Sequence, residues 1–156
     1  MGPVRYIYKA HAVQHHRFFT GDAPENMTTP DARDFAVVLF GPASQVGFLV
    51  GVGLPVGVAL GLLLGRNVAF LFGATATAYF LLYEWLHLVY HLPAAHPLTR
   101  LPGVGRLQRH HLLHHELRLM SKWNFNITFP IFDGLLGTTW REERAPLPGA
   151  TAKARR

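Results

Sequence analysis

The sequence predicts an all-α integral membrane protein, in which a transmembrane helical hairpin carries a cytoplasmic, histidine-rich helical cap. First, residues 35–83 contain a single charged side chain, Arg66. Second, the other fourteen Lys and Arg residues lie before or after this stretch. Third, nine of the ten histidines fall into three clusters that flank it. The chain is therefore divided into a cytoplasmic segment (1–34), an interfacial segment with the hairpin (35–92) and a second cytoplasmic segment (93–156).

The composition excludes several classes of protein. The chain has 156 residues, enough for one domain, and its charged residues make up 15%, against about 25% in an average soluble domain. Apolar residues make up 49%, which excludes a disordered chain, a coiled coil and a fibrous repeat. Because the chain has no cysteine, disulfides, thiolate metal sites, iron–sulfur clusters and a cysteine nucleophile are excluded as well.

Two uncharged runs predict the hairpin. Residues 46–65 have no charged or strongly polar side chain, and as a helix they span about 30 Å, the thickness of the hydrocarbon core of a bilayer. A second run covers residues 68–83 and continues without a break to Leu92. Only Arg66 and Asn67 separate the runs, which predicts two antiparallel helices joined by a very short turn. Two buried helices of a soluble protein are the alternative, but the chain has too little other mass to cover them.

The basic residues predict the topology. Four Lys and Arg residues precede the hairpin, one lies in its turn and ten follow it. The positive-inside rule then places both termini in the cytoplasm and Arg66 on the other side of the membrane. The membrane accounts for the net charge of +6, and a nucleic-acid partner is not expected, because no aromatic side chains are interleaved with the basic ones.

Small residues predict how the hairpin packs. Four glycines at intervals of four residues form a smooth helix face: Gly53, Gly57, Gly61 and Gly65. Such a face lets another helix approach closely, and the expected partners are Gly73, Ala74, Ala76 and Ala78. The apolar run at residues 35–40 is too short to span and is expected to lie at the membrane interface.

The histidine clusters have the spacing of metal ligands. They read His11-x3-His15-His16, His87-x3-His91 and His110-His111-x2-His114-His115. Residues three or four apart share a helix face, so His11 should point the same way as His15, His87 the same way as His91, and His111 the same way as His114 and His115. Neutral imidazole binds zinc, iron and copper, and eight clustered histidines exceed what one zinc ion uses. We therefore expect two metal ions, with the first cluster near a common centre faced by five later histidines: His87, His91, His111, His114 and His115.

The remaining candidates have less specific patterns. Glu84 shares a stripe with His87 and His91 just after the uncharged run, and is a ligand, a partner for an imidazole or an interfacial charge; we favour the partner. His110 is either a neighbour of the ligands or a supporting group, and the isolated His96 is expected to bind no metal. A histidine patch that senses pH on anionic lipid explains the third cluster but not all three.

Four segments together resemble the fatty acid hydroxylase superfamily, the membrane lipid hydroxylases and sterol desaturases. They are residues 11–16 (HAVQHH), 84–91 (EWLHLVYH), 109–115 (RHHLLHH) and 124–138 (NFNITFPIFDGLLGT). The last segment is specific because it follows a histidine pair by nine residues. The resemblance covers nearly the whole chain.

The resemblance implies a small set of transmembrane helices beneath a cytoplasmic cap that holds two iron ions, for which zinc is a substitute. The ligands it implies are His11, His15, His16, His87, His91, His111, His114 and His115. It also implies an O2-dependent lipid hydroxylase or desaturase, whose partners are a lipid substrate, the bilayer and an external electron donor. Sterols, carotenoids, sphingolipids and fatty acyl chains all remain open as substrates.

The chain departs from the family pattern in two places. The family has an earlier histidine pair at the end of a preceding transmembrane helix, whereas only ten residues precede His11 here. We therefore expect a chain shortened at its N-terminus and a weaker site. The first cluster also has three residues between His11 and His15, where many relatives have two. The alternatives are a truncated, catalytically inactive homologue and a non-enzymatic membrane metal-binding protein.

Overall fold

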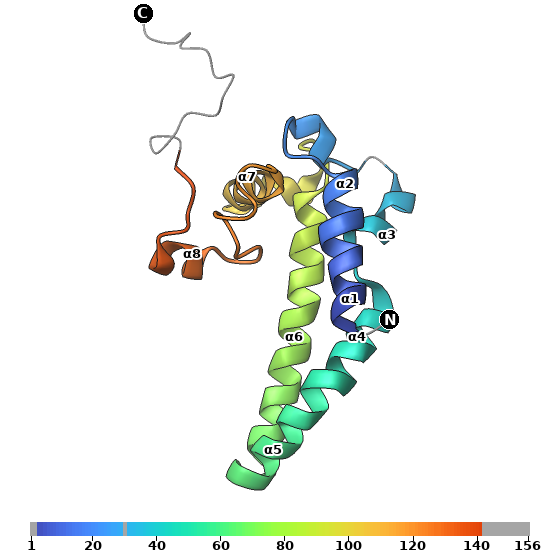
Figure 1. The fold of residues 1–156 in the computed structure, drawn as a ribbon, viewed down its shortest axis with the longest axis vertical. Coiled ribbons are helices and arrows are strands. Elements are labelled where there is room, and N and C mark those ends of the chain that lie inside the picture. Colours follow the sequence, from blue (N-terminus) through green and yellow to red (C-terminus); the bar gives the residue numbers. More distant parts are fainter. Residues whose placement is uncertain (1–2, 30, 142–156) are drawn as a thin grey trace, which may run out of the picture.

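The computed structural model describes residues 3–29 and 31–141. Helices make up 70% of the structure, with no strand among the described residues. Figure 1 shows a long stalk of two helices with shorter helices gathered around one end. The predicted all-helical class is confirmed.

The stalk is the predicted hairpin. Its first arm consists of α4 (Gly41–Phe48), the π-helical η4 (Leu49–Gly53) and α5 (Leu54–Leu64), and its second arm is α6 (Arg66–Tyr90). Both arms are long and apolar enough to cross a membrane, and neither is covered by the rest of the chain over its most apolar window. In a helix the backbone hydrogen bonds are satisfied internally, which is a condition for any segment that crosses a membrane.

The turn of the hairpin is tighter than predicted. Gly65 alone separates α5 from α6, with φ at +97°, a conformation that glycine adopts without a steric penalty. Arg66 and Asn67, which were predicted to form the turn, are instead the first two residues of α6. Their backbone groups can join the helix because the glycine makes the whole reversal.

The two arms pack along the predicted glycine face. A Cβ atom added to Gly61 would lie 3.3 Å from the Cβ of Ala69, and one added to Gly57 would lie 3.9 Å from Cδ1 of Phe72. The partners at these close approaches are therefore nearer the turn than the expected 73–78 stretch. The one-residue turn explains the difference, because it brings residues at equal distances from Gly65 opposite each other.

The N-terminal part of the cap is one continuous helical stretch beside the upper part of α6 (Figure 1). It comprises α1 (Pro3–Tyr8), η1 (Lys9–His15) and α2 (His16–Phe18). Its middle part is π-helical, since the backbone N–H of His16 donates to the carbonyl of His11, five residues earlier.

Shorter elements complete the cap. They are η2 (Pro24–Met27), η3 (Ala32–Asp34) and α3 (Phe35–Val38) before the stalk, and η5 (Pro97–Arg100), α7 (Val104–His115) and α8 (Ile131–Leu136) after it. Val38, in the apolar run predicted to be interfacial, is 3% exposed and packs against Phe19 and Met27. This run therefore contributes to the interior of the cap.

The cap has little apolar core. One cluster contains Phe19, Met27 and Val38, and another contains Val89, Leu92 and Val104. Eight of the ten histidines, in contrast, are buried. Because buried polar groups are destabilising unless they have partners, an interior built mainly of imidazole rings requires a specific explanation.

Candidate metal centre

The structure brings together the eight histidines that the sequence predicts as ligands. Their nitrogen atoms form two groups, and within each group they all lie within 4.8 Å of one another. The larger group is His15, His87, His91, His111 and His115, and the smaller group is His11, His16 and His114. The predicted convergence of three distant segments is confirmed, while metal binding itself stays a prediction.

In the larger group the Nε2 atoms form a continuous chain of close contacts. The distances are 3.0 Å from His87 to His15, 3.2 Å from His15 to His115, 3.1 Å from His115 to His111 and 3.0 Å from His111 to His91. None of these five residues is more than 1% exposed. Five ring nitrogens therefore point into one small volume that solvent does not reach.

Backbone carbonyls hold the outer nitrogens of three of these rings. Nδ1 of His15 donates to the carbonyl of Val37 at 3.0 Å, Nδ1 of His91 to Met27 at 2.8 Å, and Nδ1 of His115 to Phe19 at 2.8 Å. A carbonyl oxygen only accepts hydrogen bonds, so each Nδ1 must carry the proton. In the neutral ring, Nε2 then presents a lone pair to the centre of the group.

This tautomer leaves two lone pairs facing each other. Nε2 of His15 and Nε2 of His115 are 3.2 Å apart, and neither carries a proton to share. Two such lone pairs repel each other, and a cation bound to both removes the repulsion. Metal-bound histidines almost always donate their other ring N–H to a carbonyl or carboxylate, as these do. The larger group therefore fits a metal ion.

Burial keeps the rings in the neutral form that binds metal. Burial, with the neighbouring histidines contributing, lowers the pKa of His15 to about 2 and that of His16 to about 3. The same causes lower the pKa of His11 to about 4, and burial lowers that of His91 to about 4. At neutral pH these imidazoles are uncharged, and a lone pair on each is available.

The smaller group adjoins the larger one. The ring of His16 lies 5.0 Å from the rings of His11 and His114 between centroids, and it stacks on His115 at 4.2 Å. Nδ1 of His114 donates to the carbonyl of Asn124 at 2.9 Å, which leaves its buried Nε2 without a proton and without a hydrogen-bond partner. The residues thus fit a second metal ion next to the first.

The structure corrects the predicted membership of each group. The rings of His11 and His15 stack 5.0 Å apart, as their spacing predicts, but their nitrogens fall in different groups: His11 joins His16 and His114, and His15 joins the larger group. In α7, His111 and His115 differ by about 40° around the axis, whereas His114 lies about 100° from His115. His114 therefore turns toward the smaller group, away from the centre to which it was assigned.

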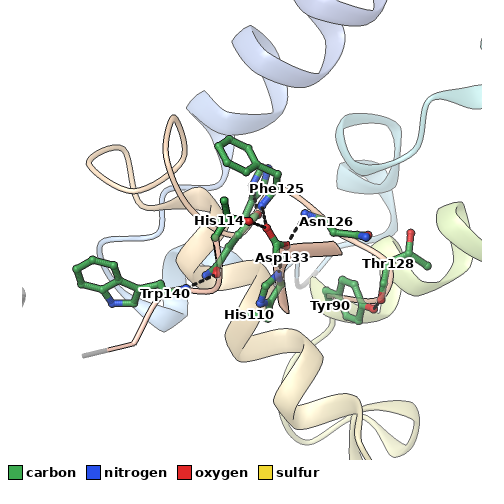
Figure 2. A network of polar contacts seen from close by, with 10 residues as sticks. Tyr90, His110, His114, Phe125, Asn126, Thr128, Asp133 and Trp140 are labelled. Atoms are coloured by element: carbon green, nitrogen blue, oxygen red, sulfur yellow. Dashed lines mark hydrogen bonds and ion pairs between the residues drawn. The ribbon is translucent and has the colours of Figure 1, made fainter. Parts of the chain in front are cut away.

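A buried carboxylate that the sequence analysis did not single out organises the loop after α7. Asp133 is 1% exposed and accepts hydrogen bonds from the backbone N–H groups of Phe125 at 3.0 Å and Asn126 at 2.7 Å. The hydroxyl of Thr138 donates to it at 2.6 Å. Burial alone would raise the pKa of Asp133, but these hydrogen bonds outweigh it and the pKa is lowered. Figure 2 shows the carboxylate enclosed by this loop and α7.

The hydrogen bonds around Asp133 adjoin Asn124, whose carbonyl accepts from Nδ1 of His114. Asn124 has φ at 54°, which asparagine tolerates better than most residues, and its N–H donates to the carbonyl of Thr138 at 2.9 Å. Its Oδ1 accepts from the backbone N–H of Trp140 at 2.9 Å (Figure 2). The only sequence signal for this role was the segment 124–138, which contains both Asn124 and Asp133.

The remaining candidates lie outside both groups. Oε2 of Glu84 accepts from the backbone N–H of Phe40 at 3.0 Å, and its other oxygen has no hydrogen-bond partner. The expectation that Glu84 is a partner for an imidazole was therefore wrong. It holds Phe40, whose ring stacks on His11 at 5.7 Å. Nε2 of His110 lies 3.3 Å from Asp133, which favours the supporting role. His96 accepts from the N–H of Leu98 and caps η5.

Comparisons of the chain with protein-family models, curated proteins and solved structures find no match in any of the three. The function is therefore inferred from the geometry of the two histidine groups and from the sequence segments that resemble the hydroxylases.

Proposed function

We propose that the chain is a membrane-bound di-iron oxygenase that hydroxylates or desaturates a lipid C–H bond with O2 and external electrons. One observation supports this more than any other. Eight imidazoles, seven of them buried, lie in two adjacent groups beside a hairpin long enough to cross a membrane. A centre of this composition at the end of a membrane stalk suits redox chemistry on a substrate that resides in the bilayer.

The number of imidazoles favours iron over zinc. Five imidazoles meet in the larger group, whereas a structural zinc site has four ligands. This count supports a metal of higher coordination number, such as iron.

The protein itself orients the histidine rings and keeps water away from them. Iron bound here would supply the activation of O2, which no amino-acid side chain supplies. The carbonyls of Val37, Met27 and Phe19 orient three of the rings, and Asn124 orients His114. Burial of the rings excludes water, which would otherwise compete with the substrate for a strong oxidant.

A cavity beside the histidines has more apolar than polar lining. Its volume is about 550 Å³, and it reaches His11 and His15. Most of its other lining is apolar, including Phe18, Val37 and Leu39. An acyl or isoprenoid chain in this cavity would bring a C–H bond next to both histidine groups.

Metal analysis of the purified full chain tests the first half of the proposal. We expect two iron ions per chain in protein reconstituted into nanodiscs, and loss of most of that iron in His91→Ala and His114→Ala. Removal of one ligand or its supporting partner commonly lowers metal affinity 10–100-fold, so the iron affinity of each variant should fall at least ~10-fold. His96→Asn is the matched control, because it removes an imidazole outside both groups and keeps an acceptor for the N–H of Leu98.

Product analysis tests the second half. Iron-loaded nanodiscs are given sterol, carotenoid, sphingolipid and fatty acyl substrates, together with O2 and a reductant. We expect one lipid class to gain an oxygen atom or to lose a pair of hydrogens, as seen by mass spectrometry. Bound iron without any lipid product would contradict the oxygenase and support the alternatives, an inactive homologue or a non-enzymatic metal-binding protein.

A further inference from the structure

We propose that residues 124–140, centred on α8, lie in the plane of the membrane interface and form a second contact with the bilayer beside the hairpin. Six large apolar side chains of this segment are exposed: Phe125 (50%), Phe129 (39%), Ile131 (63%), Phe132 (63%), Leu135 (74%) and Leu136 (75%). Contiguous exposed apolar surface of this kind is rare on soluble monomers and marks a contact with a partner or a membrane.

The charges of the segment fit a lipid surface. Asp133 is the only charged residue between Asn124 and Trp140, and its side chain is turned inward, 1% exposed. The exposed side is therefore uncharged along its whole length. Exposed Arg141 follows the segment directly and exposed Lys122 precedes it by two residues, where both can reach lipid phosphates. An uncharged apolar face with flanking basic residues is the composition of a segment that lies on a membrane.

Contacts with α6 fix the depth of the segment. A cavity of about 340 Å³ is lined by Tyr79 and Tyr83 of α6 and by residues 125–128, so this loop lies against the end of the uncharged part of α6. From Arg66 to Tyr83 the helix rises about 26 Å, close to the thickness of the hydrocarbon core. The loop is thus level with the edge of the core, and Figure 1 shows α8, which follows it, out to one side at the height of the upper half of α6.

Aromatic residues typical of a membrane–water interface lie at the same depth on α6. Tyr79 is 52% exposed and Trp85 is 42% exposed, and both lie on α6 near this edge. Tyrosine and tryptophan are enriched where a membrane protein crosses the headgroup region. The loop at residues 125–128 adjoins α6 at this depth, so the bilayer that covers the hairpin also reaches the apolar face of α8. This shared depth favours the bilayer over a second protein as the partner.

Site-specific fluorescence in vesicles tests the proposal. The chain has no cysteine, so Phe132→Cys and Leu135→Cys each give one site for an environment-sensitive dye. Arg106→Cys, on an exposed position of α7, is the matched control. The labelled full chains are reconstituted into phosphatidylcholine vesicles that contain lipids with a nitroxide either near the headgroup or near the end of the acyl chain. Circular dichroism and thermal unfolding identify any variant that fails to fold.

We expect the shallow nitroxide to quench the dye at positions 132 and 135 several-fold more than at 106, and the deep nitroxide to quench it less than the shallow one does. Aqueous iodide should give the opposite order, with 106 quenched most. Equal iodide quenching at all three positions would place the face in water and overturn the proposal. Protection from both iodide and nitroxide lipids would show that protein covers the face, and would overturn it as well.

Discussion

At the scale of single residues, backbone carbonyls decide which ring nitrogen carries the proton in three histidines of the larger group. The carbonyls of Val37, Met27 and Phe19 each take the Nδ1 proton of one ring, and so direct a lone pair inward. These carbonyls come from segments that precede the stalk, whereas His91 and His115 lie after it. Residues 11–37 therefore contribute both histidines of the two groups and the carbonyls that orient histidines from other elements.

Asp133 is the residue at which this dependence is most easily tested. Its two carboxylate oxygens accept three hydrogen bonds, from Phe125, Asn126 and Thr138. In Asp133→Asn an NH2 group would face at least one of these donors, and a buried unsatisfied donor costs about 1–3 kcal/mol. We expect the midpoint of thermal unfolding to fall by about 2–4 °C for each kcal/mol, together with a loss of iron from the His114 side of the centre.

Thr138→Ser is the control for this variant, because it keeps the hydroxyl that donates to Asp133 at 2.6 Å. It should unfold near the wild-type temperature and keep its iron. If Asp133→Asn is as stable as Thr138→Ser and binds as much iron, the carboxylate does not support the centre.

At the scale of elements, the loop after α2 and the end of α7 are in backbone contact. A Cβ atom on Gly21 would lie 2.6 Å from the backbone N of Glu116 and 2.6 Å from the carbonyl oxygen of Leu112. No side chain fits there, so the loop can approach α7 only through a glycine. The approach places the carbonyl of Phe19 on Nδ1 of His115.

Gly21→Ala should therefore separate the loop from α7. We expect destabilisation of about 1–3 kcal/mol, the usual range for overpacking, and weaker iron binding because His115 loses its carbonyl. Gly105→Ala is the matched control: nothing lies within 4 Å of its added Cβ, and alanine is the better helix former by about 1 kcal/mol. Denaturant unfolding and iron content measure both effects, and equal results for the two variants would refute the close approach.

The hairpin offers a second pair of glycines. Gly61→Leu forces a large side chain into the 3.3 Å approach to Ala69, whereas Gly47→Leu adds one where nothing lies within 4 Å. We expect the first variant to lower the thermal midpoint in nanodiscs, because the arms must move apart, and the second to leave it near wild type. A midpoint that falls equally in both variants would mean that the arms do not pack at Gly61.

The elements that sequence could predict are those fixed by local pattern. The uncharged runs on either side of Arg66 require membrane-length helices whatever the rest of the chain does, and the histidine spacings require helical faces. The π-helix at residues 9–15 has no comparable signal, because α- and π-helical turns suit the same residues and tertiary contacts choose between them. The shared face of His11 and His15 was predicted correctly, since their rings stack 5.0 Å apart, but spacing could not show that their nitrogens belong to different groups. Asp133 was missed because two of its three hydrogen-bond donors are backbone groups.

At the scale of the whole molecule, the cap is held together by polar groups more than by apolar ones. Its two apolar clusters are small, while eight histidines are buried. Buried imidazoles without a cation leave lone pairs facing each other, so metal binding and folding of the cap are expected to be coupled. Exposed large apolar side chains occur on the hairpin and on α8, and also on the cap, at Ile7, Tyr8, Phe18 and Leu117.

This interior makes stability depend on pH. In the unfolded chain the histidines bind protons below about pH 6.5, whereas burial holds His11 and His91 neutral in the folded cap until about pH 4. The unfolded state then binds more protons, so the unfolding free energy must fall as the pH falls through this window. Each such histidine contributes up to about 1.4 kcal/mol per pH unit.

Thermal midpoints of chelator-treated protein should be constant near neutrality and fall steeply below about pH 6. Iron-loaded protein should keep its midpoint to lower pH, because protons must first displace the metal. A midpoint that stays constant down to about pH 4 without metal would show that the imidazoles are solvated, and would contradict the buried cage.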